Sequence, residues 1–128
     1  MNVLELNPLV LAYLGDSVYE SHVRRYLIDQ KIANVNDLQT ESLNYVSAKS
    51  QARILEYLQE NDCFYEDELD IIRRARNTKS THHPKSCDIL TYKHATALEA
   101  VIGYLSFLGR EERILELTSP ELLKLFHL

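Results

Sequence analysis

The chain has 128 residues, of which 45% are hydrophobic and 26% are charged, with three glycines and three prolines. This composition is typical of one compact globular domain, expected to span residues 1–128, and excludes collagen-like, low-complexity and disordered chains. No apolar run approaches the ~20 residues that cross a bilayer, and the N-terminus lacks the features of a signal peptide. We therefore expect a cytoplasmic protein with no membrane association.

The net charge of −5 disfavours a nucleic-acid partner, but the charges are segregated along the chain. Residues 54–70 include seven acids and no lysine or arginine. Residues 71–94 include six lysines and arginines against one acid, Asp88. A basic segment of this kind can bind phosphate groups even on an acidic protein.

Apolar spacing predicts an all-α fold that begins with a helix over about residues 8–29. Asn7 is suited to cap this helix, and Pro8 to occupy its first position. The residues that recur at helical spacing are Leu11, Leu14, Val18 and Tyr19. Gly15 costs such a helix roughly 1 kcal/mol relative to alanine. Its presence indicates close approach of another backbone, either within the fold or across a subunit interface.

Five further segments follow in chain order. A helical region capped by Asn36–Asp37 is predicted to run to about residue 60, with a break near Ser47, and a third helix covers 66–77. Residues 78–90 have the composition of a loop. The most hydrophobic helix covers 91–108 and is stopped by Gly109. Ser119 and Pro120 repeat the cap and proline start before a short last helix over 121–126. The predicted core residues of the most hydrophobic helix are Ala95, Leu98, Val101, Ile102 and Leu105.

Two acidic residues lie in apolar helical surroundings, Asp16 in the first helix and Glu99 in the most hydrophobic one. A buried and unpaired carboxylate costs several kcal/mol, so such residues persist when they pair with a base, accept hydrogen bonds or bind a cation. Two carboxylates with water and substrate phosphate would suffice for Mg²⁺. Spacing alone does not decide between this site and simple pairing with a lysine or arginine.

The segment 11–20, which contains Leu14-Gly15-Asp16-Ser17-Val18, resembles the signature helix of the ribonuclease III family. The segment 98–103, Leu-Glu-Ala-Val-Ile-Gly, resembles the second acidic helix of that family. Further similarity in residues 45–52, 76–77, 84–85 and 91–92 is to the mini-ribonuclease III branch, which has a nuclease domain and no double-stranded-RNA-binding domain. The resemblance covers residues 5–117 and implies a ribonuclease III-type helical endonuclease domain.

The resemblance assigns metal binding and catalysis to Asp16 and Glu99. Two other acids of the full-length family are absent, because Ala12 and Thr96 occupy their positions. The mini branch is similarly reduced, so this loss does not imply an inactive enzyme. It does argue against a site lined fully by carboxylates or holding two metal ions.

The function that the resemblance implies is that of an Mg²⁺-dependent endoribonuclease, with Mn²⁺ as a possible substitute. Such an enzyme cleaves double-stranded RNA through an activated water and leaves 5′-phosphate and 3′-hydroxyl ends. The family role of the mini branch is maturation of the 23S ribosomal RNA precursor. The resemblance also implies a homodimer in which the signature helices meet at the interface. Close packing of these helices would explain why residue 15 is a glycine.

The basic segment is the strongest candidate for holding an RNA duplex, which proteins recognise mainly through its backbone and shape. Its candidate RNA-binding residues are Arg73, Arg74, Arg76, Asn77, Lys79 and Lys85. The alternative is a solvated surface that balances the preceding acidic run. His94 is either a surface residue or a phosphate contact, and Lys49 and Gln51 face either substrate or solvent.

Other chemistries have weaker support. Cys63 and Cys87 lack metal-site spacing and are expected to be unpaired thiols, His82-His83 has no obvious third ligand, and no glycine-rich phosphate loop occurs. Two rival functions remain. One is a catalytically inactive ribonuclease III-like module that binds structured RNA. The other is a structural helical protein that pairs its buried acids with bases.

Overall fold

Helices account for all the regular structure in the described part of the chain. The computed structural model describes residues 2–79, 85 and 87–126. Its elements are a 3₁₀ helix, η1 (Val3–Glu5), and the α-helices α1 (Pro8–Asp29), α2 (Val35–Val46), α3 (Ala48–Glu60), α4 (Glu66–Asn77), α5 (Ile89–Phe107), α6 (Glu111–Leu117) and α7 (Pro120–Lys124). The all-α prediction is confirmed. No helix within these residues is both long enough and apolar enough to span a membrane.

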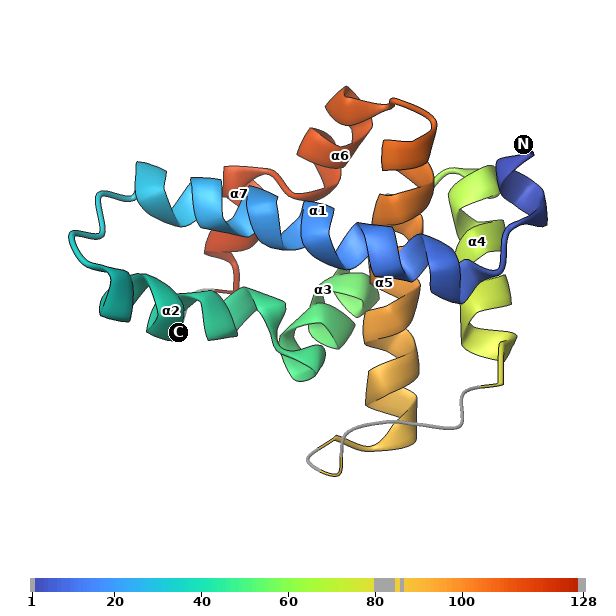
Figure 1. Cartoon of the computed structure of the whole chain (residues 1–128), viewed down its shortest axis with the longest axis horizontal. Helices are drawn as coiled ribbons and strands as arrows, with labels where there is room; N and C mark the ends of the chain where they lie inside the picture. The colour runs from blue at the N-terminus through green and yellow to red at the C-terminus, as the bar shows by residue number, and fades with distance from the viewer. Residues whose placement is uncertain (1, 80–84, 86, 127–128) are drawn as a thin grey trace.

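Helix α5 is the centre of the fold. Ten of its 19 residues are buried, around its whole circumference, because α1, α3 and α4 all pack against it. Figure 1 shows α1 crossing α5 at a steep angle, with α2 running back beside α1 and α4 flanking the other side of the crossing. The five core residues predicted for this helix are all buried.

The crossing of α1 and α5 depends on two glycines. A Cβ atom added to Gly15 would lie 1.7 Å from the Glu99 carbonyl oxygen, and one added to Gly103 would lie 1.8 Å from the Leu11 carbonyl oxygen. Only glycine permits backbones to approach this closely. Of the two explanations that the sequence left open for Gly15, close approach within the fold is therefore sufficient, and a subunit interface is not needed to explain it.

Helix ends agree with several sequence signals. Asn7 caps α1 by accepting a hydrogen bond from the Leu9 amide at 2.9 Å, with Pro8 as the first helical residue. Gly109 has a φ of 74°, and it ends α5 together with Arg110, whose amide donates to the Leu105 carbonyl at 2.9 Å. This hydrogen-bond pattern is the Schellman motif. Ser119 caps α7 as expected.

Other predicted boundaries were wrong. The cap of α2 is Asn34, which accepts from the Asp37 amide at 2.9 Å, and Asn36 and Asp37 lie within the first turn. The predicted break at Ser47 is confirmed, and this residue caps α3. Helix α6 was not predicted, because its seven residues bury only Ile114 and Leu117 and show too short an apolar pattern.

A buried ion pair joins α6 to α4. Glu68 is fully buried and accepts hydrogen bonds from Arg113 Nε and Nη2, both at 2.8 Å, and from the Tyr65 amide at 2.9 Å. The guanidinium also lies over the Tyr65 ring, 4.1 Å from its centroid. Asp67 beside it accepts from the Tyr104 hydroxyl at 2.8 Å. These contacts explain why a helix as short as α6 is stable here.

Candidate active site at the crossing of α1 and α5

The close approach of two backbones brings Asp16 and Glu99 together. Gly15 packs directly against the carbonyl group of Glu99, so the next residue of α1 lies beside the Glu99 side chain. Asp16 is exposed to solvent, and Glu99 is partly buried. The two sequence-predicted acids, which lie far apart in the chain, therefore share one place on the molecule.

The Asp16 carboxyl group contributes to a raised pKa of Glu99. This pKa is raised to about 8, mainly by burial and also by a hydrogen bond with Asp16 and by the charge of Asp16. The Gln51 side chain acts in the opposite direction, because it donates a hydrogen bond to the Glu99 carboxylate. A neighbouring carboxylate disfavours the ionised form of Glu99 unless a positive charge is present.

Simple pairing with a base does not explain these acids. Among the residues that the structure describes, no lysine, arginine or histidine forms an ion pair with Asp16 or Glu99. Glu20, one turn beyond Asp16, pairs instead with Arg24 at 3.0 Å. Within the described part of the chain, neither acid has the basic partner that the pairing alternative and the structural role require.

The donor set fits a hydrated Mg²⁺ ion. This cation binds through one or two carboxylates and keeps several waters, so two adjacent carboxylates without a basic partner suit it. No cluster of three or more histidine, cysteine, aspartate or glutamate side chains suited to a metal occurs in the described residues. Ala12 and Thr96, which replace two family acids, are both 6% exposed and supply no carboxylate here. The arrangement suits one ion coordinated largely by water.

Two side chains beside this pair were not assigned to the site from the sequence. Tyr19, on α1, is fully buried and donates a hydrogen bond to the Tyr45 carbonyl at 2.6 Å. Burial raises its pKa, and the charge of Glu99 raises it further. The sequence left open whether Gln51 faces substrate or solvent. It is only 3% exposed, so it does not face solvent. A signal was present, because Gln51 continues the apolar stripe of Ile54, Leu55 and Leu58.

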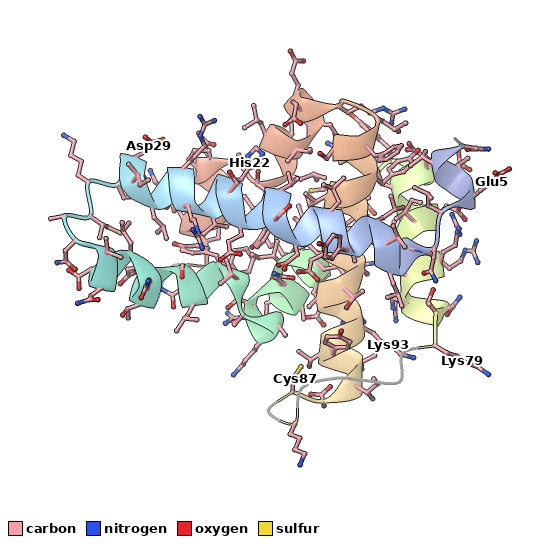
Figure 2. All side chains as sticks on the ribbon, in the orientation of Figure 1. Glu5, His22, Asp29, Lys79, Cys87 and Lys93 are labelled. Atoms are coloured by element: carbon pink, nitrogen blue, oxygen red, sulfur yellow. The ribbon has the colours of Figure 1, made fainter. Side chains whose placement is uncertain are left out.

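The candidate RNA-binding residues have unequal surroundings. Arg73 is exposed but pairs with Asp70 at 2.6 Å, and Arg74 donates to the Leu6 carbonyl at 3.2 Å, which ties α4 to the N-terminal segment. Three others are exposed without a described partner in the structure, namely Arg76, Asn77 and Lys79, and Lys85 is also exposed. Figure 2 shows that Lys79 and Lys93 lie toward the N-terminal end of α5.

The remaining titratable residues make no second metal site in the described part of the chain. His94 is partly buried rather than a surface residue, its Nε2 atom has no partner, and its pKa is lowered by burial and then by Arg76. Lys49 is exposed. The two cysteines are unpaired, as expected. His82 and His83 lie outside the described residues.

Comparison with known proteins gives a consistent result. Residues 9–110 match the family model for the ribonuclease III domain. The chain is 49% identical to the mini-ribonuclease 3 of Staphylococcus aureus, over 85% of this chain and 81% of that protein. It is 40% identical to the mini-ribonuclease 3 of Streptococcus pneumoniae, over 89% of each chain.

A solved structure of a Fusobacterium nucleatum protein is also similar, with a TM-score of 0.78 and 34% sequence identity. The similarity covers 88% of this chain and 89% of that one. The segment that matches the family model contains Asp16, Glu99 and the crossing of α1 and α5. This chain belongs to the ribonuclease III family of endoribonucleases, in its mini-ribonuclease III branch.

Proposed function

We propose that this protein cleaves double-stranded RNA in a reaction that requires a divalent cation, Mg²⁺ or its substitute Mn²⁺, bound by Asp16 and Glu99. The observation that supports this proposal is the pair of adjacent carboxylates, which has no basic partner among the described residues. When bound there, a divalent cation would lower the pKa of a water molecule and stabilise charge on the scissile phosphate.

The protein's own contribution is to hold the two carboxylates in place. Asp16 is exposed, so its carboxylate would lie close to a phosphate group of the bound RNA. Glu99 is partly enclosed, and the α5 backbone holds it in position. The overall reaction is attack of water on phosphorus with cleavage of the P–O3′ bond. The products would be a 5′-phosphate, and a 3′-hydroxyl that takes up the proton.

For the RNA surface we propose the exposed end of α4 and the segment that follows it. Arg76, Asn77 and Lys79 have no protein partner in the described structure and so are available to phosphates and 2′-hydroxyls. Arg73 is already paired with Asp70, and Arg74 is bound to a backbone carbonyl. We therefore rank these two below the other three as RNA contacts.

We also propose that two copies associate through the outer face of α1. Tyr13 is 84% exposed and Val10 is 54% exposed, one turn apart on the face opposite the crossing. A second copy would cover these apolar groups and present a second carboxylate pair to the other RNA strand. Replacing Tyr13 with aspartate should then yield a monomer in light-scattering measurements. If this variant is still a dimer, the interface does not lie on the outer face of α1.

As the cellular substrate we propose the paired ends of the 23S ribosomal RNA precursor, which would place the protein in the cytoplasm. This proposal rests on membership of the mini-ribonuclease III branch. Cells that lack the protein should accumulate 23S RNA with extended ends, measured by mapping of both termini. Correctly trimmed 23S RNA in such cells would contradict this substrate assignment.

One incubation tests the reaction itself. End-labelled duplex RNA is mixed with purified protein, with Mg²⁺ or with EDTA, and the ends of any fragments are analysed. We expect cleavage only with Mg²⁺, and fragments that carry 5′-phosphates and 3′-hydroxyls. Cleavage that persists in EDTA would contradict the role of the cation.

A catalytically inactive RNA-binding module is the second candidate, and it is favoured by one observation. Ala12 and Thr96 remove two of the acids that full-length relatives carry, and both are buried. Such a module would bind duplex RNA equally well with and without Mg²⁺ and leave it intact. The same incubation, followed by native gel electrophoresis, separates this candidate from the nuclease.

A further inference from the structure

Gln51 is a polar residue on a face of α3 that otherwise carries apolar side chains. It is 3% exposed, and it lies in line with Ile54 and Leu55, which are 1% and 0% exposed. Burial of a side-chain amide is unfavourable unless its hydrogen bonds are satisfied. The partners of the Gln51 amide group should therefore indicate why a glutamine is present.

One N–H group of Gln51 fixes the side chain to the end of α2. Its Nε2 atom donates to the Val46 carbonyl at 3.2 Å. The neighbouring Tyr45 carbonyl accepts from the Tyr19 hydroxyl at 2.6 Å. The last carbonyls of a helix lack partners within the helix. Side chains from α3 and α1 satisfy two of them here, so the end of α2 is tied both to Gln51 and to the helix that carries Asp16.

Gln51 also acts on the candidate metal site. Its side chain lowers the pKa of Glu99 in the manner of a hydrogen-bond donor, and α3 packs against α5. Because the Val46 carbonyl and the Glu99 carboxylate are both acceptors, the amide nitrogen of Gln51 must be turned toward them. The flipped orientation would place its oxygen against the Val46 carbonyl and the Glu99 carboxylate, which are both acceptors.

The Oε1 atom of Gln51 is buried and has no hydrogen-bond donor among the described residues. An unpaired buried carbonyl of this kind is destabilising. Its unpaired state is what we expect of an acceptor whose donor arrives with a ligand. The hydration waters of a divalent cation are donors of that kind, and a Mg²⁺ ion keeps several of them.

We propose that Gln51 is a positioning residue for the cation site, which holds the Glu99 carboxylate in the orientation that binds the ion. This inference rests on the proposed role of Asp16 and Glu99. Gln51 connects Glu99 to the Val46 carbonyl at the end of α2. Loss of such an outer partner typically weakens metal binding about 10–100-fold, although the ligands themselves are unchanged.

The test compares Gln51→Met with Gln59→Met in the full chain. Methionine has a similar size to glutamine and no amide, and Gln59 lies about two turns further along α3 without a role in the site. Mn²⁺ binding is measured by the loss of its free electron paramagnetic resonance signal. We expect the Kd to rise roughly 10–100-fold in Gln51→Met. We expect it to change less than about twofold in Gln59→Met.

Three outcomes would count against the inference in distinguishable ways. If Gln51→Met binds Mn²⁺ as tightly as the wild type and is only less stable, Gln51 is merely structural. If the wild type binds Mn²⁺ and Asp16→Asn binds it equally, the cation site is elsewhere and the proposed function fails as well. If the wild type binds no Mn²⁺, both proposals are overturned.

A measurement on the unchanged protein covers the case in which Gln51→Met does not fold. In ¹⁵N-labelled wild type, the side-chain amide signals of Gln51 should shift on addition of Mg²⁺, and those of Gln59 should stay in place. The same titration of Glu99→Gln should leave the Gln51 signals unmoved. Gln51 signals that do not respond to Mg²⁺ in the wild type would overturn the inference.

Discussion

Glu68 on α4 and Glu99 on α5 are both enclosed glutamates, but their surroundings are opposite. Glu68 is fully buried and accepts hydrogen bonds from the Arg113 guanidinium and a backbone amide. Glu99 lies beside the Asp16 carboxylate, which raises its pKa after burial has already done so. Asp67, next to Glu68, has a lowered pKa, because hydrogen bonds from Tyr104 and Arg110 outweigh its burial.

The contrast separates an acid that stabilises the fold from one that does not. A buried carboxylate with all its hydrogen bonds satisfied contributes to the attachment of α6. Two facing carboxylates without a base raise the free energy of the folded chain, and sites that break the ordinary rules of stability in this way tend to be functional. The energetic cost at the crossing of α1 and α5 is what we expect of a site that awaits a cation.

The largest effect on this comparison should come from Gly15→Ala, because it forces the two acids apart. The added Cβ would lie 1.7 Å from the Glu99 carbonyl oxygen, which is backbone and has little freedom to move. We expect unfolding to become easier by about 4 kcal/mol or more in urea titrations.

The matched control is Gly109→Ala. Its Cβ would meet no atom within 4 Å, and only its φ of 74° is unfavourable, so a loss of about 1–2 kcal/mol is expected. Equal losses in the two variants would show that the crossing tolerates a wider separation than the structure has.

Arg113→Met should have the next largest effect, since it leaves Glu68 buried without its partner. Breaking a buried ion pair by removing one member costs about 3–5 kcal/mol, and the lower end applies here because Arg113 keeps 13% exposure. Arg110→Met removes a partner from the exposed Asp67 pair and should cost less than about 1 kcal/mol. Chemical denaturation of both variants gives the comparison, and similar losses would contradict the special status of Glu68.

A smaller effect is expected in the pH dependence of stability without metal. The pKa of Glu99 rises from 4.5 to about 8 on folding. Between these values the folded chain keeps a proton that the unfolded chain has lost, so this carboxyl makes stability fall as pH rises from about 4.5 to about 8. His22 and His94 have lowered pKa values and act in the opposite direction.

The measurement is therefore a difference between wild type and Glu99→Gln, with EDTA present. Thermal unfolding of the two proteins should diverge as pH rises through this window, with the variant relatively more stable at about pH 8. Parallel curves over the whole range would mean that Glu99 is neither enclosed by the fold nor held beside Asp16.

The smallest expected effect concerns the basic side chains, where the same contrast between paired and unpaired groups applies. Arg76→Glu with Lys79→Glu should weaken duplex RNA binding and reduce its dependence on salt, by about one unit of slope for each phosphate that the variant no longer binds. Arg73→Glu should have less effect, because Arg73 already pairs with Asp70. Fluorescence anisotropy at several salt concentrations compares the two variants. A larger loss of RNA binding in Arg73→Glu would contradict the proposed RNA surface.

Much of the fold could be predicted from local signals in the sequence. The caps at Asn7 and Ser119, the break near Ser47 and the stop at Gly109 are short-range patterns, and each is confirmed. Helix α6 was missed because its stability comes from Arg113 and Glu68, which are 45 positions apart. A pairing at that distance has no periodic signal along the chain.

The candidate site could be predicted only in part. The motifs around Asp16 and Glu99 identified the acids, but the effect of Asp16 on the pKa of Glu99 depends on the packing of α1 against α5, as does the lack of a basic partner among the described residues. Gln51 carried a signal, as a polar residue in line with an apolar stripe. Its direction, toward solvent or toward Glu99, depends on where α3 lies against α5.

Cleavage of duplex RNA by Asp16→Asn at saturating Mg²⁺ tests the central claim most directly. Asp29→Asn is the control, since Asp29 is equally an exposed aspartate of α1 but lies at its far end, away from the crossing (Figure 2). We expect Asp16→Asn to keep its fold and lose cleavage by about a thousandfold or more, as in sites where a cation provides the main charge stabilisation. Asp29→Asn should cleave like the wild type. Cleavage by a folded Asp16→Asn at the wild-type rate would contradict the assignment of this carboxylate pair as the active site.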